Sequence, residues 1–166
     1  ELVKYNPDNK VIIRELIKRI APIEKDLAGL DLDEEILLRQ LMPNHLKDLY
    51  RQQDFLEFYK TLERIPHSWS MSTCLRLFSQ KDLLKIIDSS IDDERLLTSV
   101  LVIQAFVERY EKSPKVRNLL RTLSSILDHV PLDSFYRKHL WQIKKLSTSK
   151  GLRDAIEKRF LRQAYE

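Results

Sequence analysis

Cys74 and His67 are the nearest approach to a catalytic pair in this chain of 166 residues. A histidine that accepts the proton of a cysteine thiol creates a nucleophile. Cys74, however, stands in the apolar stretch CLRLF, where a lone cysteine behaves as a small hydrophobic residue. We therefore expect Cys74 to be buried and to carry no chemistry.

The remaining polar residues do not indicate a metal or cofactor site. The histidines lack the spacing of zinc ligands, and a single cysteine cannot complete a structural zinc site. The acidic runs at 31–35 and 92–94 lack the periodicity of a calcium loop and are typical of helix caps and first turns. Only 2 glycines are present, too few for a glycine-rich phosphate loop. We predict no metal, no cofactor and no enzymatic activity. The histidines are His45, His67, His129 and His139.

A basic stretch near the end of the sequence is the other group of residues that could carry a function. Between Arg137 and Arg162, nine lysines and arginines stand against two acids, a local formal charge of +7. The whole chain carries +4, so everything outside this stretch sums to −3. This polarised charge favours an acidic or phosphorylated partner.

Trp141 lies inside the basic stretch and shares a helix face with its cations. At about 100° per residue, the apolar residues of 132–146 form one stripe, and Trp141 falls opposite Leu132. That stripe consists of Leu132, Tyr136, His139, Ile143 and Leu146. Four cations lie within roughly 60° of the tryptophan on the same helix, Arg137, Lys138, Lys144 and Lys145, and two more follow in the next segment. Together they form a candidate partner-binding set. The set comprises Arg137, Lys138, Trp141, Lys144, Lys145, Lys150 and Arg153.

Two explanations of Trp141 stay open. In the structural one, an upstream helix packs on this second face and the lysine and arginine stems frame the indole. In the functional one, the ring anchors a partner and the cations select its acidic groups. Because large exposed apolar groups are uncommon, we expect Trp141 to be at least half buried against upstream helices, with the flanking lysines exposed.

The composition predicts an all-α protein. Hydrophobic residues make up 43% and charged residues 33%, while 2 glycines and 6 prolines are too few for a many-stranded fold. We expect eight to eleven helices in an irregular bundle or in stacked helical hairpins. The length fits one domain, 1–166, with possible sub-layers at 1–90 and 91–166.

Prolines and capping residues set the expected helix boundaries. The predicted helices span 7–20, 29–42 with a stop at Pro43, one or two helices within 44–65, a helix through Phe78, and 79–91. The next, 92–110, is apolar nearly all round and is expected to be central. Ser113 and Pro114 are predicted as N-cap and first residue of a helix to 127, followed by helices at 131–146 and from 149 onward.

The sequence contains no apolar run of the roughly 20 residues that a membrane-spanning helix needs, and its first residues show no signal-peptide pattern. We therefore expect a chain that neither spans a membrane nor is secreted. A single cysteine fits a reducing, intracellular compartment.

The segment NLLRTLSSILDHVPLDSFYRKHLWQIKKLSTSKGLRDAIEKRF resembles the N-terminal helical domain of transcription elongation factor S-II and its relatives, which include the integrase-binding domain of lens epithelium-derived growth factor. A leucine-containing helix ends in a corner at 130–132, a second helix ends at 143–147, and a third follows a short polar turn. The closing Lys-Trp pair of that family is missing, with Tyr165 nearby instead. The turn STSKG is polar where the integrase-binding branch presents an aromatic residue. The resemblance implies a nuclear module that docks short disordered motifs, and it carries over no ligand-contacting residue.

These observations predict a protein-interaction module, an adaptor or scaffold that docks a partner protein or an acidic motif, in a nuclear transcription or chromatin complex. One alternative is a nucleic-acid-binding helical domain that uses the basic C-terminal helices. Another is a segment of a helical-repeat scaffold in a large complex, which predicts an extended binding surface over several helices.

Overall fold

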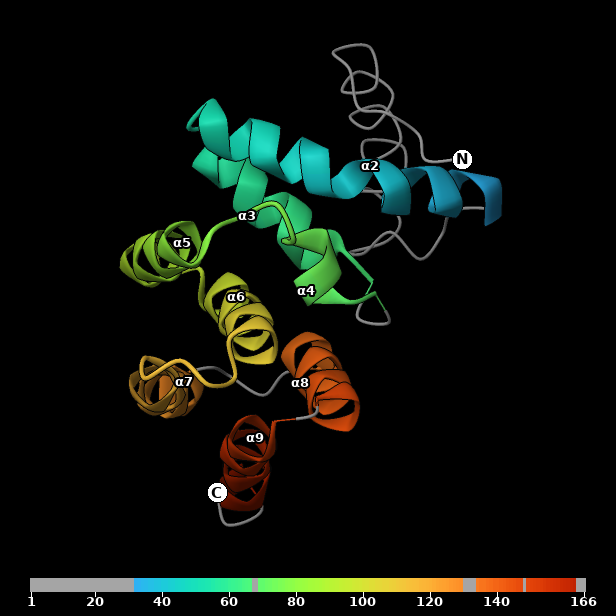
Figure 1. The fold of residues 1–166 in the computed structure, drawn as a ribbon. Coiled ribbons are helices and arrows are strands. Elements are labelled where there is room, and N and C mark those ends of the chain that lie inside the picture. The colour runs from blue at the N-terminus through green and yellow to red at the C-terminus, as the bar shows by residue number, and fades with distance from the viewer. Residues whose placement is uncertain (1–31, 67–68, 130–133, 148, 164–166) are drawn as a thin grey trace. The chain divides into compact units, whose positions relative to one another are not determined.

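The structure is a computed structural model that describes residues 32–66, 69–129, 134–147 and 149–163. Within these ranges every regular element is an α-helix, which confirms the predicted all-α class (Figure 1). The first expected helix, 7–20, lies outside the described residues. The helices are α2 (Leu32–Arg51), α3 (Phe55–Arg64), α4 (Met71–Cys74), α5 (Gln80–Asp92), α6 (Leu96–Arg109), α7 (Val116–His129), α8 (Ser134–Leu146) and α9 (Lys150–Gln163).

The chain divides into two compact units, and the boundary falls after Phe78. The expected sub-layer boundary at residue 90 lies inside α5. Among the described residues, no helix combines the length and the apolar character that spanning a membrane requires.

Helix α2, in the first unit, continues through Pro43, so the prediction that Pro43 stops it is wrong. Proline in a helix interior removes one backbone hydrogen bond and costs about 3 kcal/mol. The helix nevertheless continues because its apolar face is fully buried on both sides of the proline, at Leu38, Met42, Leu46 and Leu49, each 0% exposed. The segment 44–65 therefore forms the second half of α2 and, after a short turn, α3.

Aromatic rings join α2, α3 and the end of the first unit. Tyr50 on α2 meets Phe78 edge to face with ring centroids 5.3 Å apart, and Phe58 on α3 meets Phe78 at 5.7 Å. The Lys47 ammonium lies 4.8 Å from the centroid of the Phe78 ring. Edge-to-face pairs of this kind stabilise a core beyond the area that they bury.

Helix α4 is a single turn that Ser70 caps through a hydrogen bond from the Thr73 N–H. It ends at Cys74, so the expected helix through Phe78 is shorter than predicted. Trp69, just before this turn, is buried and donates from Nε1 to Oε1 of Glu35 on α2, 3.1 Å away. This bond ties the turn to α2.

Helix α6 is the core of the second unit, as its apolar sequence predicts. Every residue from Leu97 to Val107 is buried, among them Val100, Ile103 and Phe106. Ser90 on α5 and Ser99 on α6 share a buried hydrogen bond of 2.7 Å, which links the two helices inside the core.

Helices α7, α8 and α9 complete the second unit, and α9 packs against both α7 and α8. Helix α7 begins at Val116, whereas Ser113 and Pro114 lie in the preceding turn. There the Ser113 hydroxyl accepts the Lys115 N–H, which precedes the helix, so the prediction that Ser113 is the N-cap and Pro114 the first residue of this helix is wrong. A Cβ atom on Gly151 would lie 2.6 Å from Cδ1 of Leu120, which shows how closely α9 approaches α7.

Candidate functional site

Cys74 is buried, as predicted, with 5% of its surface exposed. Loss of hydration raises the pKa of its thiol to about 12, and nearby Arg39 lowers it by less. The thiol therefore stays protonated at neutral pH and is a poor nucleophile. His67 lies outside the described residues, so its distance from Cys74 is not described.

The histidines and the two acidic runs are not expected to bind a metal ion. Within the described ranges, no three His, Cys, Asp or Glu side chains come close enough to hold a metal ion. His45 is buried on α2 and His129 is exposed at the end of α7.

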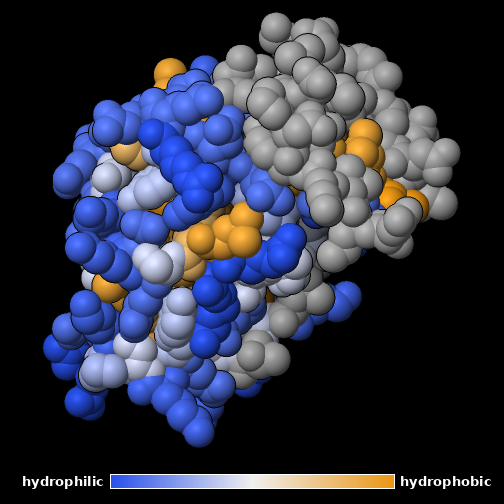
Figure 2. All heavy atoms as spheres, turned by 45° about the horizontal axis from the view of Figure 1, so that its top comes forward, coloured by the Kyte–Doolittle hydropathy of each residue, from blue (hydrophilic) through white to orange (hydrophobic). Residues whose placement is uncertain are grey.

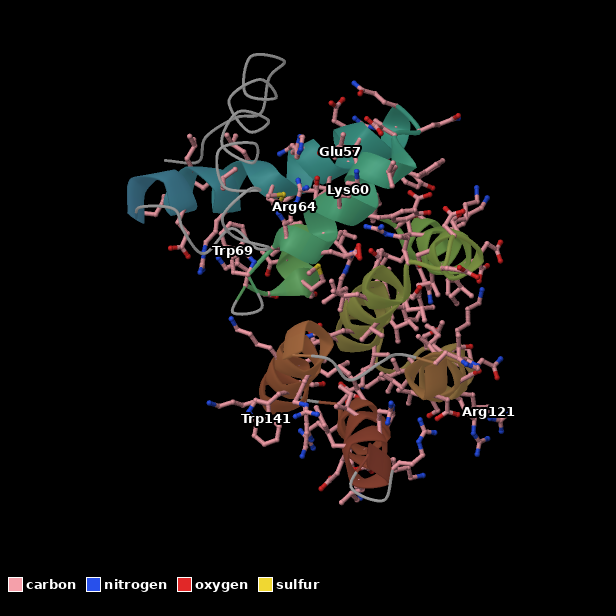
Figure 3. All side chains as sticks on the ribbon, turned by 180° about the vertical axis from the view of Figure 1, so that it is seen from behind. Glu57, Lys60, Arg64, Trp69, Arg121 and Trp141 are labelled. Atoms are coloured by element: carbon pink, nitrogen blue, oxygen red, sulfur yellow. The ribbon has the colours of Figure 1, made fainter. Side chains whose placement is uncertain are left out.

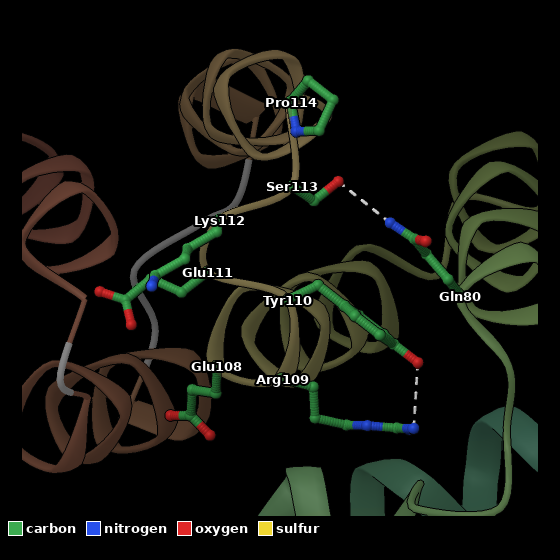
Figure 4. Close-up of a pocket in the computed structure, with 8 residues that line it drawn as sticks. All are labelled: Gln80, Glu108, Arg109, Tyr110, Glu111, Lys112, Ser113 and Pro114. Atoms are coloured by element: carbon green, nitrogen blue, oxygen red, sulfur yellow. Dashed lines mark hydrogen bonds between the residues drawn. The ribbon is translucent and has the colours of Figure 1, made fainter.

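A hollow of about 560 Å³ lies at the turn between α6 and α7 (Figure 4). On one side Gln80 donates to the Ser113 hydroxyl at 3.0 Å, and Arg109 donates to the Tyr110 hydroxyl at 3.0 Å. Glu108 is half-buried, and loss of hydration raises the pKa of its carboxyl, with a smaller lowering by Gln104. Two acids, two basic side chains, two hydroxyl groups and one amide line this hollow, so its lining favours no single ligand chemistry.

Trp141 is 54% exposed, so the prediction that it is at least half buried against upstream helices is wrong. The reason lies in which face of α8 is buried. Leu140 and Ile143 are 1% and 4% exposed and turn toward the core, and Ile143 belongs to the predicted apolar stripe. At about 100° per residue, Trp141 lies about 100° from Leu140 and about 160° from Ile143 around the helix, and Figure 3 shows it projecting outward from α8.

Phe160 on α9 is the ring neighbour of Trp141. The two rings meet edge to face, with centroids 6.2 Å apart and planes at 75°. Phe160 follows Trp141 in the chain, so the support for the indole comes from a downstream helix instead of an upstream one. The contact leaves more than half of the tryptophan in solvent.

Lys144 covers another part of the indole. Its ammonium lies 5.3 Å from the centroid of the Trp141 ring and 3.9 Å from Oε1 of Glu157 on α9. Cations attract the face of a tryptophan ring. Lys144 is therefore held between an aromatic ring and a carboxylate.

The pairing of α8 with α9 explains this arrangement. Trp141 pairs with Phe160, Lys144 with Glu157, and Ser147 with Arg153. The residue number rises on one helix as it falls on the other, so the two helices run antiparallel. Only three residues separate the end of α8 at Leu146 from the start of α9 at Lys150, and so short a connection favours this antiparallel pairing.

The other predicted cations divide into two groups. Arg137, Lys138, Lys145 and Lys150 are exposed, so the expectation that the lysines flanking Trp141 are exposed is confirmed for Lys138 and Lys145. It is wrong for Lys144, whose side chain is only 27% exposed because it packs between the indole and Glu157. Arg153 is half-buried and donates to the Ser147 carbonyl at 2.9 Å, so it serves the α8–α9 turn. The structure thus places Arg137, Lys138, Trp141, Lys144 and Lys145 on α8, with Lys150 and Arg153 at the start of α9.

Two further cations of the basic stretch are engaged within the fold. Arg159 is 8% exposed and donates to the Leu127 carbonyl, and Arg162 pairs with Asp128. The local charge of +7 therefore overstates the charge that is free to meet a partner. Phe160 is the site residue that the sequence reading missed, although an antiparallel pairing of the last two helices about their short turn would have placed it beside Trp141.

Among the described residues, the large exposed hydrophobic side chains are Ile36, Phe55, Leu56, Leu77, Trp141 and Leu161. On the face drawn in Figure 2, the described surface is mostly hydrophilic, with hydrophobic side chains in small groups. Phe55 also has an aromatic neighbour, Tyr50, with ring centroids 6.1 Å apart. Trp141 differs because it is more exposed, at 54% against 36%, and because the exposed cations Arg137, Lys138 and Lys145 stand on its own helix. We call Trp141, Phe160, Arg137, Lys138, Lys144, Lys145 and Lys150 the Trp141 surface.

Comparisons with protein-family models, with curated proteins and with solved structures give no match for this chain.

Proposed function

We propose that this chain is a protein-interaction module that docks a partner on the Trp141 surface. The module acts by binding and carries no catalytic centre. The observation that supports the proposal most directly is the 54% exposure of Trp141 beside the exposed lysines of α8. Tryptophan and arginine are the residues most enriched at the energetic centres of protein interfaces.

The charge of this surface favours an acidic partner. Trp141 has Arg137 and Lys138 one turn before it and Lys145 one turn after it, all exposed. A partner that places carboxylates beside an apolar anchor would gain both ring contact and charge attraction. Charges at the rim of such a surface act mainly on the rate of encounter.

Nucleic acid is the alternative partner, and the internal contacts of the cations argue against it. Phosphate recognition requires many cations that face outward along one track. Arg159 is buried and Arg162 pairs with Asp128. Apart from Arg162, the exposed cations of the basic stretch therefore lie mainly on α8 and at Lys150, with Lys158 further along α9.

The setting that we propose is a nuclear transcription or chromatin complex, with the chain as an adaptor. The support for it is the resemblance of 118–160 to the S-II N-terminal domain class. A segment of a longer helical scaffold is the more general form of the same proposal, in which the partner would extend over several helices.

Affinity enrichment with three forms of the protein tests this proposal. The wild type, Trp141→Ala and the control Leu161→Ala differ by one exposed apolar side chain each, since Leu161 is 58% exposed. A protein that the wild type and Leu161→Ala retain and Trp141→Ala loses is then purified, and its affinity is measured at several salt concentrations. If the three forms retain the same proteins, or only nucleic acid, the proposal is wrong.

A further inference from the structure

Glu157 lies where a carboxylate of an acidic partner would be expected. Its Oε1 atom is 3.9 Å from the Lys144 ammonium, which itself lies 5.3 Å from the centroid of the Trp141 ring. Phe160, the ring neighbour of Trp141, stands almost one helical turn after Glu157 on α9. One acidic side chain and one aromatic side chain of the chain itself therefore contact Lys144 and Trp141.

The contact between Lys144 and Glu157 is easily exchanged. The distance of 3.9 Å is long for an ion pair, and the Glu157 side chain is 52% exposed. Exposed pairs of this kind contribute little to stability, because water screens them and two long side chains lose freedom. A carboxylate from outside can replace that of Glu157 without disturbing the fold.

We propose that Glu157 is a built-in competitor of the acidic partner: it holds Lys144 in the free protein and releases it when a partner carboxylate binds. This inference rests on the proposed function of the Trp141 surface. It names the partner as a segment in which an acidic residue stands beside an apolar or aromatic anchor. The anchor takes the exposed part of the indole, and the acid takes the place of Glu157 at Lys144.

A cationic ligand does not fit the same surface. Aromatic rings bind ammonium groups, but Lys144 already lies over the Trp141 ring. Lys138 and Lys145 flank that ring as exposed cations. A second cation would meet repulsion from all three lysines, whereas an anion would be attracted to each of them.

Two acids of α9 allow a matched test. Glu157 and Asp154 are both exposed and stand on the same helix. Glu157→Gln and Asp154→Asn each remove one negative charge, so both raise the general attraction for an acidic peptide by a similar amount. Only Glu157→Gln also frees Lys144, since Asp154 forms no ion pair with the described residues.

The probe is a short fluorescein-labelled peptide with one phenylalanine between aspartates and glutamates. Three controls accompany it: the peptide with alanine for phenylalanine, the peptide with amides for its acids, and a single-stranded oligo-thymidine. Fluorescence anisotropy at physiological ionic strength gives the dissociation constants for the wild type, Glu157→Gln, Asp154→Asn and Trp141→Ala. We expect Glu157→Gln to bind the acidic phenylalanine peptide about two- to fourfold more tightly than Asp154→Asn does, the range that one exposed ion pair contributes.

The outcomes separate the inference from the proposed function. If Trp141→Ala loses the peptide but Glu157→Gln and Asp154→Asn bind it equally, the Trp141 surface stands and the competitor role of Glu157 is wrong. If the wild type fails to bind the acidic phenylalanine peptide, or Trp141→Ala binds it as well as the wild type, both are wrong. If oligo-thymidine binds more tightly than the peptide and its binding also depends on Trp141, the protein-docking function and the competitor role of Glu157 are both wrong. The Trp141 surface would then bind nucleic acid.

Discussion

Arg159 on α9 donates from Nε to the backbone carbonyl of Leu127 on α7, 2.9 Å away. Arg159 is buried, with 8% of its surface exposed. Leu127 lies in the last turn of α7, where carbonyl groups have no partner within the helix and where the helix dipole favours a cation. The buried guanidinium thus joins the end of α7 to α9. Arg159 belongs to the basic stretch of the sequence, but its role in the fold is to connect α7 and α9.

Replacing Arg159 by alanine should lower the free energy of unfolding by about 2–3 kcal/mol, because a buried carbonyl loses a charged donor and a packed side chain is removed. Chemical denaturation of the variant measures the change. Lys158→Ala, at the exposed neighbouring position, should change it by less than about 0.5 kcal/mol. Equal effects of the two substitutions would show that the contact between α7 and α9 does not depend on Arg159.

Glu94 closes the end of α5 in the left-handed region, with φ 58°, and Arg95 then donates from its N–H to the Ser90 carbonyl at 2.8 Å. A side chain in this region costs about 1 kcal/mol or more, and glycine avoids that cost. Glu94→Gly should therefore raise the free energy of unfolding by about 0.5–1 kcal/mol. Asp93→Gly, where φ is −85°, should lower it instead. A gain in the second variant, or a loss in the first, would contradict this reading of the turn.

Glu108 should make stability depend on pH. Loss of hydration raises the pKa of its carboxyl above the ordinary value of 4.5. The folded protein then binds the proton more tightly than the unfolded chain does, so the free energy of unfolding decreases as pH rises from about 4.5 through the raised pKa. Glu108→Gln should remove this decrease, so the free energy of unfolding of the variant should increase relative to that of the wild type as pH rises from about 4.5 through the raised pKa. Denaturation curves across that range check it, with Glu111→Gln as an exposed control; a parallel pH profile in Glu108→Gln and the wild type would be evidence against it.

The helix class, the central position of α6 and the burial of its core follow directly from the sequence, because an apolar run without a polar face must be enclosed. The passage of α2 through Pro43 does not, since it depends on the tertiary burial of Leu38, Met42, Leu46 and Leu49. The sequence also does not predict the left-handed turn that ends α5. Glycine usually occupies the left-handed position after a helix, but the chain has only 2 glycines and Glu94 occupies that position here.

The candidate site was predicted in part. Helical angles correctly placed Trp141 with the cations of α8 and away from Ile143, because that relationship is local to one helix. Its exposure and its contact with Phe160 depend on how α9 packs against α8, which a single helix does not specify. The count of cations likewise could not separate Lys145, which is exposed, from Arg159, which is buried.

The role of Trp141 is tested most directly by the affinity of Trp141→Ala for the acidic phenylalanine peptide, measured together with its thermal unfolding. We predict that binding weakens about thirtyfold or more, the usual effect at an interface centre of about 2 kcal/mol, while the melting temperature falls by only a few degrees. Leu161→Ala, which removes another exposed apolar side chain of α9, should bind the peptide as the wild type does. Unchanged affinity in Trp141→Ala, or a loss of affinity that merely follows a collapse of the unfolding transition, would contradict the proposal that Trp141 is the anchor of a docking surface.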